Sequence, residues 1–169
     1  MLTVVIYDTK FGNTAKIAAA IARGAGARGG VRVLDTAEAA QALTERPDLL
    51  IVGGPTQRRG PSPALRGFVD ALPPSLRHVP AAAFDTRYRG ATLLMGSAAA
   101  EAAKRLGKAG SRLAAPPESF FIARGGPLEG QGLEPGELER AEAWGRAVGA
   151  AATSGAPTRS ELLGERGVR

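Results

Sequence analysis

The residues that follow the first apolar run combine hydroxyl groups with a flexible turn. Thr9 and Thr14 flank the pair Gly12-Asn13, and a helical pattern begins at this pair. At the start of a helix, backbone N–H groups and the positive end of the helix dipole favour a bound anion. Both threonines add hydroxyl donors. The spacing predicts a phosphate site, and a simple helix cap at Asn13 or Thr14 is the alternative interpretation.

The residue types that most hydrolases need are scarce. The 169 residues include no cysteine and one histidine, His78. Disulfide bonds, thiolate nucleophiles, cysteine-ligated zinc and iron–sulfur clusters are therefore excluded. A single histidine also argues against a Ser-His relay or a histidine metal site within one chain. We expect no catalytic side chain and no metal ligand, so redox chemistry would have to come from a bound cofactor.

The chain is basic, and its excess charge is concentrated. Lysine and arginine number 22 against 16 acidic residues, and the net charge is +6. Six arginines and two aspartates lie within residues 55–89. Basic proteins often bind nucleic acid, but these arginines are not interleaved with aromatic residues. No apolar run reaches the roughly 20 residues of a membrane span. We expect neither nucleic acid nor membrane as a partner, and a cytoplasmic location.

Apolar runs alternate with helical patterns along the chain. Strands are expected at residues 2–7, 31–34, 48–53, 81–84 and 119–123. Helices are expected to begin near Asn13, Thr36, Ser62 and Ser97, the last three as capping residues, and a final helix is expected around Trp144. The runs are nearly continuous, which is typical of parallel strands covered on both faces. The alternation predicts one α/β domain over residues 1–152, a doubly wound parallel sheet in three layers. The polar residues 153–169 are expected to form a disordered tail.

Ligands of open α/β sheets bind outside the carboxyl ends of the strands, where the strand order reverses. Besides the first loop, this rule selects the segments that follow the third and fourth predicted strands, residues 54–60 and 85–90. Four arginines of the basic stretch lie in these two segments. We therefore expect positive charge around the ligand.

The first loop resembles that of the flavodoxins. The family pattern Thr/Ser-x-Thr/Ser-Gly-Asn-Thr is matched by Thr9-Lys10-Phe11-Gly12-Asn13-Thr14, and Val52-Gly53-Gly54-Pro55-Thr56 is similar to the family's loop after the third strand. The resemblance extends over roughly residues 2–150. It implies a five-stranded sheet of order 2-1-3-4-5 with FMN at the switch point, for which flavodoxin is the standard example.

The resemblance also implies which residues bind FMN. The first loop would hold the phosphate, and the two later segments would enclose the isoalloxazine ring. The implied residues are Thr9, Lys10, Phe11, Gly12, Asn13 and Thr14, then Pro55, Thr56, Gln57, Arg58 and Gly60, and finally Asp85, Thr86, Arg87 and Tyr88. Phe11 replaces a hydroxyl residue of the family pattern, and residues 54–60 contain no aromatic residue. Tyr88 is therefore the expected stacking residue. Two roles stay open for Asp85, a bond to the flavin edge or a bond to loop N–H groups.

The resemblance implies a protein that binds FMN and acts in electron transfer. It also implies a redox partner protein, and the basic loops indicate that this partner is acidic. An electron carrier is expected rather than a substrate-specific enzyme. Two alternatives stay open. One is a flavodoxin-like domain that has lost FMN and serves as a binding or regulatory module, which Phe11 would favour. The other is an FMN-dependent oxidoreductase of quinones or porphyrins. The sequence does not determine the oligomeric state.

Overall fold

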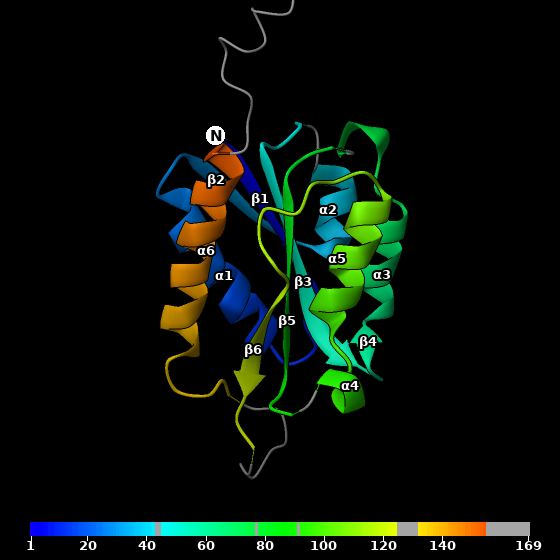
Figure 1. Cartoon of the computed structure of the whole chain (residues 1–169), viewed down its shortest axis with the longest axis vertical. Coiled ribbons are helices and arrows are strands. Elements are labelled where there is room, and N and C mark those ends of the chain that lie inside the picture. Colours follow the sequence, from blue (N-terminus) through cyan, green and yellow to red (C-terminus); the bar gives the residue numbers. More distant parts are fainter. Residues whose placement is uncertain (43–44, 77, 91, 125–131, 155–169) are drawn as a thin grey trace, which may run out of the picture.

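Figure 1 shows the computed structural model of the chain, which describes residues 1–42, 45–76, 78–90, 92–124 and 132–154. A sheet runs through the middle of the molecule and helices cover both of its faces, so the chain forms three layers. None of the helices in these ranges is long and apolar enough to cross a membrane. The predicted α/β architecture is confirmed.

Five parallel strands form the main sheet in the order β2-β1-β3-β5-β6. They are β1 (Leu2–Tyr7), β2 (Gly30–Asp35), β3 (Leu49–Gln57), β5 (Ala81–Tyr88) and β6 (Glu118–Ile122). The two-residue strand β4 (Gly60–Pro61) pairs antiparallel with the end of β3. Counted without β4, this is the predicted order 2-1-3-4-5. The centres of β1 and β3 are fully buried, as expected for strands covered on both faces.

Two strands run farther toward the carboxyl edge of the sheet than the apolar pattern predicted. β3 and β5 each continue four residues beyond the predicted end, to Gln57 and Tyr88. Residues 54–55 lie opposite residues 85–86 in the parallel ladder. The prediction that residues 54–57 and 85–88 belong to loops is therefore wrong. Polar residues are held in the strands here because each backbone pairs with its neighbour.

Helices α1 (Asn13–Gly26) and α6 (Glu137–Ser154) cover one face of the sheet, and α2 (Thr36–Ala42), α3 (Pro63–Asp70) and α5 (Ala98–Lys108) cover the other (Figure 1). A short helix, α4 (Thr92–Met95), lies beyond the carboxyl end of β5, and a 3-10 turn, Pro74–Leu76, follows α3. Since α6 ends at Ser154, the first two residues of the predicted tail are helical. The rest of that tail, residues 155–169, lies outside the described residues.

The helix caps agree with the sequence in two cases of three. The hydroxyl of Ser62 accepts a hydrogen bond from the backbone N–H of Leu65 at 3.2 Å, which confirms the predicted start of α3. Ser97 accepts in the same way at the start of α5. Thr36 is itself helical, so its predicted capping role is wrong. The carboxylate of Asp35 caps α2 instead, accepting from two backbone N–H groups at 2.8 Å each.

Close packing of α1 against α6 fixes the position of α1. A Cβ atom on Gly145 would overlap the backbone carbonyl oxygen of Ile21, and one on Gly24 would overlap that of Glu142. The two helices can approach this closely only because both positions are glycine. The packing holds α1 on the sheet with its N-terminus at the carboxyl edge.

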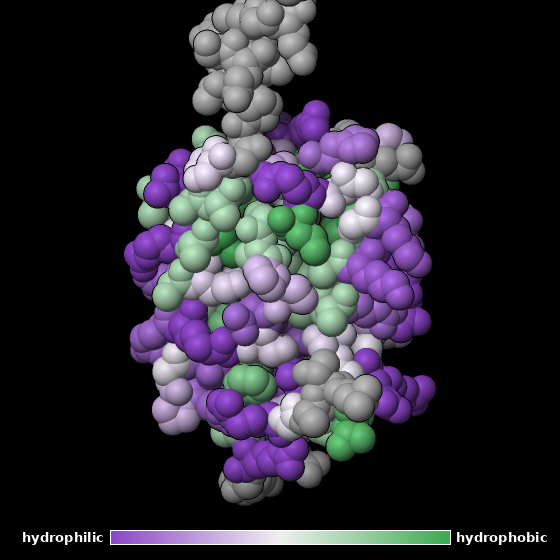
Figure 2. Space-filling view, in the orientation of Figure 1, coloured by the Kyte–Doolittle hydropathy of each residue, from purple (hydrophilic) through white to green (hydrophobic). Residues whose placement is uncertain are grey.

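Hydrophobic and hydrophilic residues occupy different parts of the surface. In the view of Figure 2, hydrophilic residues cover the flanks formed by the helices, and hydrophobic surface lies between α6 and α5. Three further exposed hydrophobic residues, Phe11, Leu94 and Met95, belong to the first loop and to α4. These segments lie at the carboxyl edge, so that edge is partly apolar.

Candidate functional site

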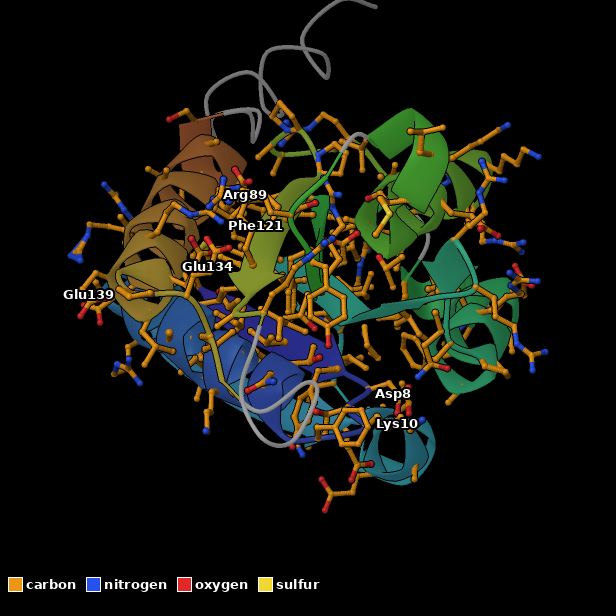
Figure 3. All side chains as sticks on the ribbon, turned by 90° about the horizontal axis from the view of Figure 1, so that it is seen from below. Asp8, Lys10, Arg89, Phe121, Glu134 and Glu139 are labelled. Carbon is orange, nitrogen blue, oxygen red and sulfur yellow. The ribbon has the colours of Figure 1, made fainter. Side chains whose placement is uncertain are left out.

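The carboxyl edge of the sheet brings together segments that are far apart in the sequence. Figure 3 views this edge from below, with Asp8 and Lys10 on one side and Arg89, Phe121 and Glu134 on the other. The first loop follows β1, the turn between β3 and β4 follows β3, and the residues after Tyr88 follow β5. All three segments predicted to bind the ligand therefore meet at one edge.

The first loop is shaped by a glycine and one side-chain hydrogen bond. The backbone N–H of Gly12 donates to the Thr9 hydroxyl oxygen at 3.0 Å. Gly12 has a φ of 84°, in the left-handed region that favours glycine. A Cβ atom at this position would meet nothing within 4 Å, so glycine is needed for the backbone angle and not for space. The loop is therefore a tight turn that leads directly into α1.

The N-terminus of α1 is suited to an anion. Gly12 is the N-cap residue and has no side chain to cap the helix, and the first turn contains no acidic residue. The positive end of the helix dipole therefore carries no negative side chain from its own first turn. The Thr14 hydroxyl lies 2.7 Å from the Thr86 hydroxyl in a buried contact. When Thr86 donates in this pair, Thr14 keeps its own proton for a ligand.

Two exposed residues complete the first loop. Phe11 is 60% exposed, and the ammonium of Lys10 lies 5.1 Å from the centre of its ring. Phe11 therefore brings no side-chain donor to the loop where the family pattern has a hydroxyl group. Lys10 brings a positive charge to the same loop, which favours an anion there.

The second segment is a tight hairpin and not an open loop. Gln57 pairs with Gly60, so Arg58 and Arg59 form a two-residue turn between β3 and β4. Both arginines have positive φ, 46° and 74°. This is the geometry that asparagine and glycine usually occupy, and it costs about 1 kcal/mol for each non-glycine residue. Both arginines are exposed at the carboxyl edge.

The third segment lies mostly inside the protein. Asp85, Thr86 and Arg87 are buried residues of β5. Arg87 is 9% exposed, and its guanidinium donates to the Ser119 hydroxyl and to the Gly90 carbonyl oxygen at 3.0 Å each. The expectation that the Arg87 charge faces a ligand is therefore wrong, because its hydrogen bonds go to protein groups. Asp85 likewise bonds inside the protein: its carboxylate accepts from the Thr56 and Ser97 hydroxyls and from the Ala99 N–H in the first turn of α5, not from a loop N–H group.

Arg89 is also paired with groups of the same chain. It donates to the Glu134 carboxylate and lies 4.0 Å from the centre of the Phe121 ring. The hydrogen bond from Arg89 lowers the pKa of Glu134, and the same bond raises the pKa of Arg89. Of the six arginines in residues 55–89, Arg77 lies outside the described residues.

Tyr88 ends β5 and is half-buried. The Arg124 guanidinium lies 5.4 Å from the centre of its ring. Its place at the carboxyl edge, beyond Thr86 on the same strand, agrees with a stacking role. That role stays a prediction.

The family model for flavodoxin matches residues 5–144 of the chain. The chain belongs to the flavodoxin family. A flavodoxin from the domain Archaea shares its fold, with a TM-score of 0.71 and 18% identity over 90% of this chain and 99% of that chain. Flavodoxin 1 from Bacillus cereus gives a TM-score of 0.70 and 19% identity over 93% and 100% of the two chains. The flavodoxin, WrbA-like protein from Agrobacterium tumefaciens gives a TM-score of 0.68 and 22% identity over 90% of this chain and 98% of that chain. No curated protein sequence matches the chain.

FMN is the cofactor of the flavodoxin family, and the donor set of the first loop fits its phosphate. A left-handed glycine opens α1, the helix has no capping side chain at Gly12, and a threonine hydroxyl lies in the first turn. Backbone N–H groups and a helix dipole are the groups that bind phosphate in proteins. The geometry of the first loop is therefore compatible with the phosphate role that the resemblance implies, and that role stays a prediction.

Several residues of this edge were missed by the sequence interpretation. Ser97 was recognised only as a helix cap, and Ser119, Gly96 and Glu134 were not singled out at all. Each acts through a contact with a residue more than ten positions away in the sequence. A search for polar residues at predicted strand ends would have found Ser119, which begins the predicted strand 119–123, but not Ser97.

Proposed function

We propose that the protein is a cytoplasmic electron carrier that binds FMN and exchanges electrons with an acidic protein partner. The observation that best supports this proposal is the N-terminus of α1, where Gly12 has a left-handed backbone conformation and no side chain caps the helix. When bound, FMN supplies the ability to accept and release electrons, which this chain's side chains lack. We assign the phosphate to residues 9–14 and the ring to the region between the Arg58-Arg59 turn and Tyr88.

The acidic partner is proposed from the residues that surround this site. We define the rim as the exposed residues of the first loop, the β3–β4 turn and α4, which are Lys10, Phe11, Arg58, Arg59, Leu94 and Met95. Leu94 is 72% exposed. The rim combines three basic side chains with three apolar ones, and the acidic residue of the first loop, Asp8, is half-buried beside it. Apolar contact with charge of one sign around it suits a transient partner of opposite charge.

Titration of the apo-protein with FMN tests the proposal first. We expect stoichiometric quenching of flavin fluorescence with a dissociation constant below about 1 μM. No uptake at micromolar concentration would contradict the proposal and support a domain that has lost FMN. Steady-state turnover of quinones by the loaded protein would support an enzyme instead of a carrier.

The charge of the partner is tested by measuring electron transfer from the reduced protein to an acidic acceptor protein and to a basic one. We expect the acidic acceptor to react faster, with a rate that falls as salt is added. Arg58→Glu should slow that reaction several-fold. Lys108→Glu makes the same charge change at the C-terminal end of α5, away from the rim, and should have little effect. Equal rates with both acceptors would contradict an acidic partner.

A further inference from the structure

Asp85 is a buried carboxylate that joins three separate elements just inside the carboxyl edge. Its side chain is fully buried. One carboxylate oxygen, Oδ2, accepts three hydrogen bonds: from the Thr56 hydroxyl at 3.0 Å, the Ser97 hydroxyl at 2.7 Å and the Ala99 backbone N–H at 3.0 Å. The other oxygen, Oδ1, lies 3.9 Å from the Arg87 guanidinium. These bonds connect β3, β5 and α5.

The same residues close the N-terminus of α5. The Ala98 N–H donates to the Thr56 hydroxyl at 2.9 Å, and the Ala100 N–H donates to the Ser97 hydroxyl at 3.1 Å. Asp85 accepts from the N–H between them. Three successive N–H groups of the first turn are thus satisfied by side chains from three elements, and the carboxylate lies at the positive end of the helix dipole. This is a rigid joint, because removing any member leaves a buried group unpaired.

The joint holds the Arg58-Arg59 turn from two sides. Thr56 precedes this turn by two residues on β3. On the other side, Gly96 directly precedes Ser97 and has a φ of 72°. A Cβ atom on Gly96 would overlap the backbone of Arg59, so the two segments are in close backbone contact. The strained conformation of the turn is therefore fixed by the residues that Asp85 holds together.

We propose that Asp85 is a positioning residue for the ring end of the FMN site. It sets the place of the Arg58-Arg59 turn through Thr56 and Ser97 and does not itself touch the cofactor. The proposal rests on the assignment of the ring to this turn. It differs from a general structural role because the first loop, which holds the phosphate, depends on none of these hydrogen bonds.

Two substitutions of Asp85 separate hydrogen bonding from charge. The side chain in Asp85→Asn offers one carboxamide oxygen that can accept the same three bonds. The side chain in Asp85→Leu has the same number of heavy atoms and the same branching and accepts none. The first measurement is hydrogen exchange in the apo-protein. We expect Asp85→Leu to speed exchange at least tenfold at residues 59–60 and 96–100 and to leave residues 12–15 within threefold of wild type. Asp85→Asn should stay within threefold everywhere.

The second measurement compares three ligands of the apo-protein: FMN, riboflavin, which lacks the phosphate, and inorganic phosphate. We expect Asp85→Leu to weaken FMN and riboflavin by the same factor, at least tenfold, and to leave inorganic phosphate unchanged. Leu106→Ala removes a buried side chain at the far end of α5 and serves as the control. It should lower thermal stability without changing any of the three affinities by more than threefold.

Several outcomes would overturn the positioning role. Flavin affinities within threefold of wild type in Asp85→Leu would do so, and so would a parallel loss of phosphate binding. If Asp85→Leu does not fold, Ser97→Ala removes two of the bonds and should give the same pattern at about threefold. A wild-type protein that binds neither flavin contradicts the proposed function, and the exchange measurement then still decides whether Asp85 fixes the turn.

Discussion

Among the helices that begin at the carboxyl edge of this sheet, α1 and α5 have N-termini that are built in opposite ways. The first turn of α5 is closed by side chains of Thr56, Asp85 and Ser97, and it already holds a carboxylate. The first turn of α1 begins at Gly12, which has no side chain to cap it. Both ends carry the positive pole of a helix dipole. Since the end of α5 already holds a carboxylate and the end of α1 has no capping side chain, we expect an anion to bind at α1 and not at α5.

Opening the closed end should have the largest effect. Asp85→Ala leaves two hydroxyl groups and one N–H group without their acceptor. We expect the free energy of unfolding of the apo-protein to fall by about 3 kcal/mol. Urea denaturation measures it. Thr3→Val is the control, since the buried Thr3 hydroxyl has no hydrogen-bond partner among the described residues. A loss below about 1 kcal/mol for Asp85→Ala would show that α5 does not need this cap.

Closing the open end is the converse experiment. Gly12→Asp places a carboxylate where the phosphate is proposed to bind and also forces a non-glycine residue to a φ of 84°. We expect FMN affinity to fall about a hundredfold, about 2.8 kcal/mol. Gly12→Ala carries the backbone cost alone and should lose about tenfold. Fluorescence titration with FMN and with riboflavin checks the cause: if Gly12→Asp weakens both ligands equally, α1 does not bind the phosphate.

A smaller effect is expected from the contact that ties α1 to β5. Thr14→Val removes the hydrogen bond between Thr14 and Thr86. The free energy of unfolding should fall by about 1 kcal/mol, because the Thr86 hydroxyl stays buried without a partner. Adding Thr86→Val should recover part of that loss. Urea denaturation of both single variants and the double variant gives the coupling energy, and strictly additive losses would contradict a paired contact.

The smallest effect is expected at Glu134, whose charge is paired with that of Arg89. The hydrogen bond from Arg89 holds the pKa of Glu134 below its ordinary value of 4.5. A carboxylate whose pKa is depressed in the folded state stabilises the protein above its unfolded pKa, and that contribution is lost as the pH falls through the folded pKa. The stability advantage of wild type over Glu134→Gln should therefore shrink below pH 4.5. Urea denaturation near neutral pH and in acid tests this, and an advantage independent of pH would argue against the pair.

Predicting the open helix end from the sequence worked because its determinants are local. Gly12, Asn13 and Thr14 are consecutive, and their order alone indicates a turn followed by a helix. The carboxyl ends of β3 and β5 were not predicted, because their determinants lie far apart in the sequence. Asp85 and Arg87 interrupt the apolar pattern of β5, and they remain in the strand because their backbones pair with β3 and β6. A periodicity of apolar residues contains no information on such partners.

The sequence by itself determined the fold class, the order of the elements and the place of the first loop, since apolar periodicity and turn residues act over a few neighbouring positions. It also determined that the segment around residues 55–89 is basic. Only the tertiary structure decided which of those charges are available at the edge. Arg58 is exposed there, whereas Arg87 and Arg89 are bound to protein groups from distant segments. A buried or paired group is satisfied by whatever the fold brings to it, and that neighbour is set by packing of the whole chain.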